Sequence, residues 1–308
     1  MTPPHFLGIA DVPAERIRAL LDRAAQLKAA RRSGDAPLRG RTLVQIFEKP
    51  SLRTRLSFDV AMAELGGHSS YLSPAEVGLG RRESVSDVAR VVARMVDAVV
   101  LRTHAHETIE EFARHSSVPV VNGLSDLEHP CQALADVLTV LERKGTKGVT
   151  VTYIGDGNNV AHSLMLCAAK AGLSLRVAAP AGFEPQPRFV ELAREAAARS
   201  GATLELGNDP ERAVAGADAI YTDVWTSMGQ EAEYERRRRA FRGFQVNAAL
   251  LARAKPDCIV MHDLPAHRGE EVTDEVLDGP QSVVFEQAEN RLHAQKAILC
   301  WLLAKGER

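Results

Sequence analysis

Short apolar stretches alternate with amphipathic stretches along most of this 308-residue chain. The apolar stretches have the length of buried strands, and the amphipathic ones carry apolar side chains at helical spacing. Two parallel strands must be joined by a long crossover, which is usually a helix. The pattern therefore predicts an α/β protein with mostly parallel sheets flanked by helices. We expect strands at residues 41–47, 97–102, 118–121, 149–154, 173–179, 219–222 and 258–262.

Amphipathic helices are expected between these strands and at both ends of the chain. Across residues 11–32, apolar side chains line one face of a predicted helix, and Arg and Lys line the other. Further helices are expected from Pro130 onward and at residues 58–65, 84–95, 107–115, 158–171, 187–200 and 286–304. By contrast, residues 68–83 predict a long mobile loop, and residues 227–244 predict an irregular region.

The length of the chain favours two domains of ordinary size, with residues 144–148 as the expected linker. A net charge of −2 predicts no general attraction to nucleic acid or to an anionic membrane. No apolar run approaches the length of a membrane span and the first residues lack a targeting pattern, so we expect a cytoplasmic protein. The four cysteines form no Cys-x-x-Cys pair and are expected to be reduced thiols rather than disulfide or zinc ligands.

The strongest candidate binding site is the turn between the first predicted strand and the following helix. Ser51, Arg53, Thr54 and Arg55 lie at this turn, where helix N–H groups and the positive end of the helix dipole are exposed. Two hydroxyls and two guanidiniums at such a turn favour a phosphate or a similar oxyanion. The alternative is that Ser51 only caps the helix and that the arginines are solvated. ATP is not implied, because the glycine and lysine pattern of nucleotide P-loops is absent.

Other polar residues of the first half lie at positions that suit a ligand site. Arg102 ends a predicted strand, and ligands of α/β sheets bind at the carboxyl ends of strands. His129, Gln132 and Asp136 are spaced to share one side of the helix that starts at Pro130. Arg291, on the final helix, would be interpreted as surface charge from local sequence alone.

The second half carries two polar loops, each directly after a predicted strand. In the first, Asp223 and Ser227 suit a ligand with an ammonium group, although Asp223 could equally cap the next turn. The second loop, residues 261–271, gathers His262 and Asp263 with further His, Arg and Glu residues. Metal binding is one interpretation of this loop, but its spacing matches no known metal motif, so we favour substrate positioning.

Two further sequence patterns bear on dinucleotide binding and nucleic-acid binding, and both argue against these functions. The segment Gly155-Asp-Gly157 resembles the start of a dinucleotide-binding motif, but the third glycine is replaced by Val160. The four arginines of residues 236–239 follow glutamates and have no interleaved aromatic residues, so they predict a solvated helix face rather than a nucleic-acid site.

A series of motifs follows in chain order: Phe47-Glu-Lys-Pro-Ser51-Leu-Arg-Thr-Arg55, Arg102, His129-Pro-Cys-Gln132, Gly155-Asp-Gly-Asn-Asn159, Asp223-x-x-x-Ser227-Met-Gly229, His262-x-Leu-Pro265 and Glu289-Asn-Arg291. Together they resemble the aspartate/ornithine carbamoyltransferase family, and the resemblance covers nearly the whole chain. The Asp-x-x-x-Ser-Met-Gly element that begins at Asp223 is similar to the ornithine branch of that family rather than the aspartate branch.

The resemblance implies two similar-sized α/β domains with the active site in the cleft between them. Residues 1–133, completed by the C-terminal helix 286–308, would bind carbamoyl phosphate, and residues 134–285 would bind L-ornithine. The expected carbamoyl phosphate residues are Ser51, Leu52, Arg53, Thr54, Arg102, His129, Gln132 and Arg291. The expected ornithine residues are Asn159, Asp223, Ser227, Met228, Asp263 and Leu264.

The resemblance also implies a reaction without a metal or an organic cofactor. The neutral δ-amino group of ornithine attacks the carbamoyl carbon, and phosphate leaves. Arg102 and His129 would be catalytic, because with Thr54 they can hydrogen-bond the carbamoyl oxygen as negative charge grows there. The family forms trimers, in which the loop around residues 73–82 reaches a neighbouring site.

The chain departs from the family pattern at Asp263, where the ornithine branch usually has a cysteine that touches the reacting amine. We expect Asp263 to take a catalytic role by pairing with the δ-ammonium. The mobile loop also lacks a clear Gln or Lys for the neighbouring subunit, and Glu76 and Arg81 are nearby substitutes. The alternatives are another amine acceptor, such as putrescine or acetylornithine, and a non-catalytic paralogue that binds a metabolite or partner.

Overall fold

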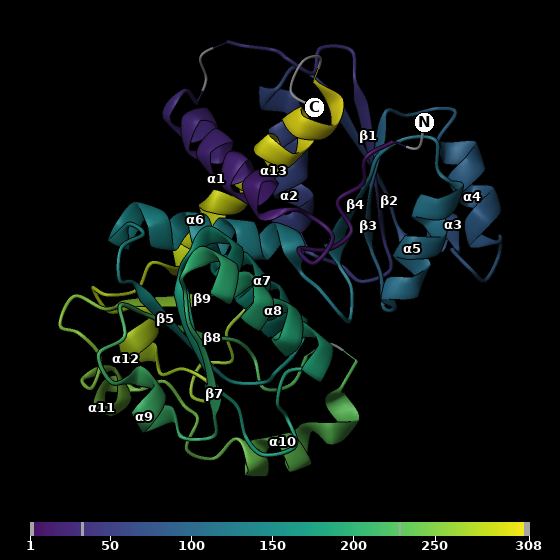
Figure 1. Ribbon diagram of the computed structural model, residues 1–308. Helices are drawn as coiled ribbons and strands as arrows, with labels where there is room; N and C mark the ends of the chain where they lie inside the picture. The colour runs from purple at the N-terminus through teal and green to yellow at the C-terminus, as the bar shows by residue number, and fades with distance from the viewer. Residues whose placement is uncertain (1–2, 32–33, 228, 305–308) are drawn as a thin grey trace. The chain divides into compact units, whose positions relative to one another are not determined.

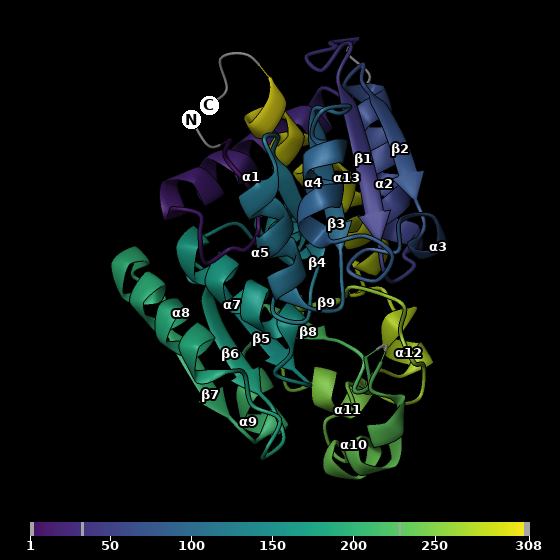
Figure 2. The ribbon, with the colours of Figure 1, turned by 90° about the vertical axis from the view of Figure 1, so that its right-hand side faces the viewer.

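The structure is a computed structural model that describes residues 3–31, 34–227 and 229–304. The chain forms two compact units (Figures 1 and 2): Met1–Leu138 with Glu289–Arg308, and Thr139–Ala288. We call them unit 1 and unit 2. Each contains one parallel sheet with helices on both faces, which confirms the predicted α/β fold class.

Unit 1 is built on a four-stranded parallel sheet with the strand order β2-β1-β3-β4. Every residue of β3 is buried, as expected for a central strand of a covered parallel sheet. Helices α4 and α5 cover one face, and α1, α2 and α13 lie on the other (Figures 1 and 2). The strands are β1 (Thr42–Phe47), β2 (His68–Leu72), β3 (Ala98–Arg102) and β4 (Val120–Leu124). The helices are α1 (Ala14–Ala29), α2 (Leu52–Glu64), α3 (Pro74–Val77), α4 (Val85–Val92) and α5 (His106–His115). Two more helices, α6 (Pro130–Lys144) and α13 (Val284–Leu303), belong to unit 1 up to Leu138 and from Glu289 onward, and their remaining residues belong to unit 2.

Unit 2 is built on a five-stranded parallel sheet with the strand order β7-β6-β5-β8-β9. From β5 the chain adds β6 and β7 on one side of the sheet and then β8 and β9 on the other, so the strand order switches between β5 and β8. Ligands of such sheets bind beside this switch point. Helices α7 and α8 cover one face, and α9, α11 and α12 lie on the other (Figure 2). The strands are β5 (Thr150–Ile154), β6 (Ser174–Ala178), β7 (Leu204–Gly207), β8 (Ala219–Thr222) and β9 (Ile259–His262). The helices are α7 (Asn159–Ala171), α8 (Pro187–Ser200), α9 (Pro210–Val214), α10 (Tyr234–Ala240), α11 (Ala248–Leu251) and α12 (Asp274–Leu277), with a short 3₁₀ turn at Glu231–Glu233.

The seven strands expected from the sequence are all present, but the prediction for residues 68–83 is wrong. This stretch contains the edge strand β2 and the short helix α3 instead of a long loop. The sequence of β2, His-Ser-Ser-Tyr-Leu, is mostly polar, which suits a strand whose residues are exposed or half-buried and never fully buried. Only its pairing with β1 identifies it as a strand. The sequence also did not predict the edge strand β7, because this short strand is exposed or half-buried and contains no run of apolar residues.

The prediction of an irregular region at residues 227–244 is also wrong in part, because α10 occupies its centre. The four arginines of residues 236–239 lie on α10, and three of them are exposed as expected for a solvated face. Arg237 is the exception, with only 7% of its surface exposed. Within the described residues, no helix is both long enough and apolar enough to cross a membrane.

Candidate active site

In unit 1, the turn after β1 brings Ser51 and Thr54 to the start of α2. Ser51 caps the helix, since its side-chain Oγ accepts a hydrogen bond from the Thr54 N–H at 3.3 Å. Its hydroxyl also donates to Thr54 Oγ1 at 3.0 Å. Leu52 exposes 75% of its surface, so only its backbone N–H, at the first turn of the helix, suits an anion. The capping role and the predicted anion-binding turn are therefore compatible.

The centre of this region is Arg291, which is 2% exposed although local sequence suggested a surface charge. Its Nη2 donates to Thr54 Oγ1 at 2.7 Å, and its Nη1 donates to Gln132 Oε1. Nη1 also lies 3.4 Å from Nε2 of His129. We call Thr54, His129, Gln132 and Arg291 the guanidinium cluster. Because the three partners are neutral, these hydrogen bonds position the guanidinium without cancelling its charge.

His129 is held in its neutral form. Burial lowers the pKa of its imidazole well below the usual value, and the positive charges of Arg291, Arg102 and Arg53 lower it further. Since a guanidinium can only donate, His129 Nε2 accepts from Arg291 and the proton resides on Nδ1. Arg102 and Arg53 thus add to the positive potential at the His129 imidazole. The guanidinium cluster therefore favours an anion.

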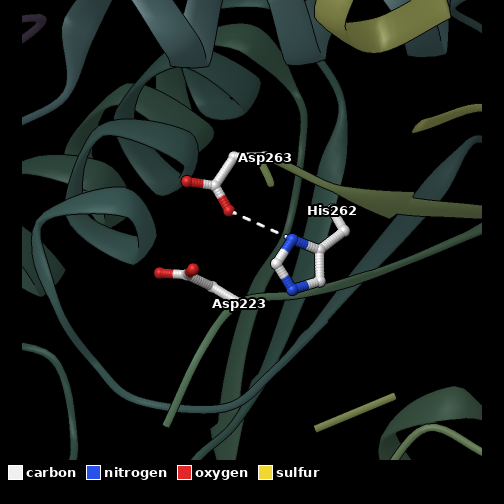
Figure 3. A group of neighbouring side chains, drawn as sticks. All are labelled: Asp223, His262 and Asp263. Atoms are coloured by element: carbon white, nitrogen blue, oxygen red, sulfur yellow. Dashed lines mark ion pairs between the residues drawn. The ribbon is translucent and has the colours of Figure 1, made fainter. Parts of the chain in front are cut away.

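In unit 2, three side chains converge at the ends of β8 and β9: Asp223, His262 and Asp263 (Figure 3). We call them the carboxylate cluster. Asp223 directly follows β8, His262 ends β9, and Asp263 follows it. Figure 3 shows the Asp223 and Asp263 carboxylates close together on one side of the imidazole. Asp263 Oδ1 lies 3.4 Å from His262 Nδ1.

The proximity of two carboxylates has an electrostatic consequence. Burial raises the pKa of Asp223 well above its usual range, and the neighbouring Asp263 carboxylate raises it further. Asn158 opposes this shift, because its Nδ2 donates to Asp223 Oδ2 at 2.8 Å. Asp223 Oδ1 also accepts the N–H of the adjacent Val224 at 2.7 Å. A cation that entered the cluster would relieve the repulsion between the two carboxylates.

The imidazole of His262 is fixed by a fully buried carboxylate, Glu271. His262 Nε2 donates to Glu271 Oε1 at 3.0 Å, and its Nδ1 accepts the Leu264 N–H at 2.9 Å. Glu271 also accepts the N–H of His267 at 2.6 Å, so it holds both ends of the loop. Leu264 has a φ of 58°, which is strained for a non-glycine residue and is typical of functional loops. The sequence analysis included Glu271 in this polar loop but assigned it no role of its own, because nothing in its local pattern distinguishes it from an exposed glutamate.

Each residue of the carboxylate cluster offers one possible metal-ligand atom, and these atoms lie within 4.8 Å of one another. His267, Glu270 and Glu271 form a second group of this kind. In the first group, however, the His262 Nδ1 lone pair already accepts the Leu264 N–H. The atoms that remain are carboxylate oxygens, which suit an ammonium group because it donates hydrogen bonds.

The structure places the remaining predicted residues as follows. Asn159 begins α7, and its Oδ1 accepts the adjacent Val160 N–H at 3.1 Å. The side chain that contacts Asp223 is that of Asn158, the N-cap of α7, which the sequence analysis did not select. The Ser227 N–H donates to Gln230 Oε1 at 3.0 Å. Met228 lies outside the described residues.

Both halves of the chain match sequence models of one enzyme family. Residues 4–142 match "Aspartate/ornithine carbamoyltransferase, carbamoyl-P binding domain", and residues 147–302 match "Aspartate/ornithine carbamoyltransferase, Asp/Orn binding domain". The chain belongs to the aspartate/ornithine carbamoyltransferase family.

Individual relatives place the chain more finely within that family. It is 55% identical over 301 residues to an ornithine carbamoyltransferase of Pyrococcus abyssi, covering 97% of this chain and 95% of that protein. It is 53% identical over 304 residues to one of Methylococcus capsulatus, covering 98% and 99%. The solved ornithine carbamoyltransferase of Pyrococcus furiosus superimposes with a TM-score of 0.95 at 54% identity, covering 100% of this chain and 99% of that one.

The neutral state of His129 predicts a specific loss of stability in acid. Its native pKa lies below that of the unfolded chain, so on acidification the unfolded state binds a proton that the native state does not. This contribution to the free energy of unfolding falls as the pH drops below about 6.5. His129→Gln keeps a side-chain hydrogen-bonding group but cannot titrate. With the native pKa of His129 below this range, lowering the pH from about 7.5 to about 5.5 should reduce the free energy of unfolding of the wild type by about 1.4 kcal/mol more than that of the variant.

Urea unfolding at the two pH values measures this difference, and nitrogen NMR of the imidazole identifies the protonated ring nitrogen directly. Equal losses in the two proteins, or an imidazolium signal from native His129 at about pH 6, would contradict the assignment.

Proposed function

We propose that this protein transfers the carbamoyl group of carbamoyl phosphate to the δ-amino group of L-ornithine, producing L-citrulline and phosphate. The observation that carries the proposal is the guanidinium cluster, in which buried Arg291 hydrogen-bonds Thr54 and Gln132 in a chain of this family. The names of the relatives support ornithine as the acceptor.

We assign carbamoyl phosphate to residues 1–133 together with residues 286–308, where the arginines gather. The phosphate would accept hydrogen bonds from the first turn of α2 and from the guanidinium groups. Thr54, Arg102 and His129 would face the carbamoyl oxygen. The Nδ1–H of neutral His129 makes it a donor without placing another positive charge beside Arg291. The full set is Ser51, Leu52, Arg53, Thr54, Arg102, His129, Gln132 and Arg291.

We assign L-ornithine to residues 134–285, where the carboxylate cluster lies. Asp223 and Asp263 would bind its ammonium groups, which relieves the repulsion that raises the pKa of Asp223. Asn159, Ser227, Met228 and Leu264 complete the proposed set. Asn158 belongs with them, because it orients the Asp223 carboxylate through the 2.8 Å hydrogen bond.

The chemistry balances without an external oxidant or reductant. The δ-ammonium first loses a proton, and the neutral nitrogen then forms a bond to the carbamoyl carbon. The resulting oxyanion collapses and the bond from carbon to the phosphate oxygen breaks. The second proton of the attacking nitrogen ends on the phosphate. Arginines stabilise the charge that develops on the leaving group, and donors at the carbamoyl oxygen stabilise the oxyanion.

The proposal is tested by product formation from carbamoyl phosphate with L-ornithine, putrescine or acetylornithine. Citrulline should form with ornithine at a far higher kcat/KM than the products of the other two amines. A higher kcat/KM with another amine would identify that amine as the acceptor in place of ornithine. If no amine gives a product although carbamoyl phosphate still binds, the protein is a non-catalytic paralogue.

The anion-binding turn predicts different roles for two arginines of one helix. Arg53→Ala should weaken carbamoyl phosphate binding by about 1.5–3 kcal/mol or more, because it removes a charge-assisted contact to the phosphate. Arg55→Ala is the matched control: Arg55 is exposed and its guanidinium lies 4.0 Å from the centre of the Tyr71 ring. Calorimetry with carbamoyl phosphate should separate the two variants. Unchanged affinity in Arg53→Ala would remove Arg53 from the site.

The position of Asp263 in the carboxylate cluster leads to a prediction about the protonation of the acceptor's δ-amino group. An ionised Asp263 pairs with the δ-ammonium, which strengthens ornithine binding but also holds its proton. The pKa of the amine is then raised in the complex, so activity should continue to rise into alkaline pH. Asp263→Asn preserves the shape and removes the charge. It should raise the KM for ornithine and shift the pH profile to lower pH, while carbamoyl phosphate affinity stays the same.

Wild-type kinetics and an unchanged pH profile in Asp263→Asn would instead assign the ammonium to Asp223. In that outcome Asp263 contributes only loop geometry, through its proximity to His262.

We also propose that the protein acts as a cytoplasmic homotrimer. The family resemblance supports the trimer, as do Leu52 and Leu56 of α2, which expose 75% and 56% of their surfaces one helical turn apart. The four cysteines are free and buried, which suits a reducing compartment.

A further inference from the structure

Arg237 is the one arginine of residues 236–239 whose side chain is buried, and it makes three hydrogen bonds in unit 2. Its Nη1 donates to Asp156 Oδ2 at 2.7 Å and to the Trp225 carbonyl at 3.0 Å. Its Nε donates to Glu233 Oε2 at 3.0 Å. Helix α10 is thereby tied to the loop after β5 and to the loop after β8.

The first of these connections reaches Asp223 through the loop after β5. Asp156 is 6% exposed, and its backbone carbonyl accepts the Tyr153 hydroxyl at 2.9 Å. Two residues further on, Asn158 donates to the Asp223 carboxylate at 2.8 Å. The ion pair between Arg237 and Asp156 therefore fixes the segment that carries the hydrogen-bond donor to Asp223.

The second connection reaches Asp223 along its own loop. The Trp225 carbonyl that accepts from Arg237 lies two residues after Asp223. Trp225 is 6% exposed, and its ring stacks on Phe241 with centroids 5.6 Å apart and planes 27° apart. Phe241 directly follows α10, so the helix holds this loop at the carbonyl and at the ring.

We propose that Arg237 is a positioning residue for Asp223 and thus for recognition of the acceptor's ammonium group. Arg237 holds from one guanidinium both the loop that carries Asp223 and the loop that carries its partner Asn158. The extension to ornithine rests on the proposed function, whereas the positioning of the loops does not.

Removal of Arg237 also leaves Asp156 as a buried carboxylate without its partner. Burial raises the pKa of Asp156, and Arg237 opposes that rise. A buried charge that loses its partner is costly, so the loop after β5 should rearrange. Asp156→Asn in the same chain removes the charge and should recover part of the loss.

The kinetic test compares Arg237→Gln with Arg238→Gln, which makes the same change at the exposed neighbouring residue. Arg237→Gln should raise the KM for ornithine about tenfold or more, since the loss of a charge-assisted hydrogen bond corresponds to about that factor. Carbamoyl phosphate affinity should not change. Arg237→Lys keeps the charge and should retain part of the ornithine affinity. Equal ornithine KM values in Arg237→Gln and Arg238→Gln would overturn the proposal.

A second readout is independent of activity. The chain has two tryptophans, so Trp301→Phe leaves Trp225 as the sole indole emitter. In that background, Arg237→Gln should shift the emission of Trp225 to longer wavelength and Arg238→Gln should not. If the wild type does not use ornithine, the proposed function fails, and the emission decides the positioning role alone. Unchanged emission in Arg237→Gln overturns that role, and a shift specific to Arg237 supports it.

Discussion

A buried guanidinium is the constraint on which unit 1 depends. Arg291 is 2% exposed, and neutral Thr54 and Gln132 orient it by hydrogen bonds. Burying such a charge is unfavourable unless other groups compensate for it. The same positive charge helps to keep His129 neutral, because an imidazolium beside Arg291 would add a second cation at this place. The start of α2, the start of α6 and helix α13 are therefore held together around one side chain that favours an anion.

Unit 2 presents the opposite electrostatic problem. Two carboxylates, Asp223 and Asp263, lie beside each other at the ends of neighbouring parallel strands, and burial makes their repulsion stronger. Glu271 fixes the imidazole beside them, and Arg237 holds the loops around Asp223. A site with preorganised negative charge suits a ligand that carries an ammonium group. The two units thus supply the complementary potentials that an anionic donor and a cationic acceptor require.

The topology of parallel sheets positions residues of both candidate sites. In a parallel sheet every strand ends at the same edge, so the loops that follow successive strands converge there. Ser51 follows β1 and Arg102 ends β3, whereas Asp223 follows β8 and His262 ends β9. Strand order thereby brings together Asp223 and His262, which are far apart in sequence. Arg291 lies on helix α13 and reaches His129 across 162 positions through helix packing instead.

The sequence by itself determined the α/β class, the seven strands with clear apolar patterns, and the polar turn of Ser51 to Thr54, because spacing and capping are local properties. Motif order identified the family. Only the tertiary structure decided which charges are buried: Arg291 and Arg237 resemble exposed arginines until distant segments enclose them. It also selected Asn158 as the partner of Asp223 and made the polar segment of β2 a strand. Burial and pairing depend on contacts between distant residues, which no local pattern contains.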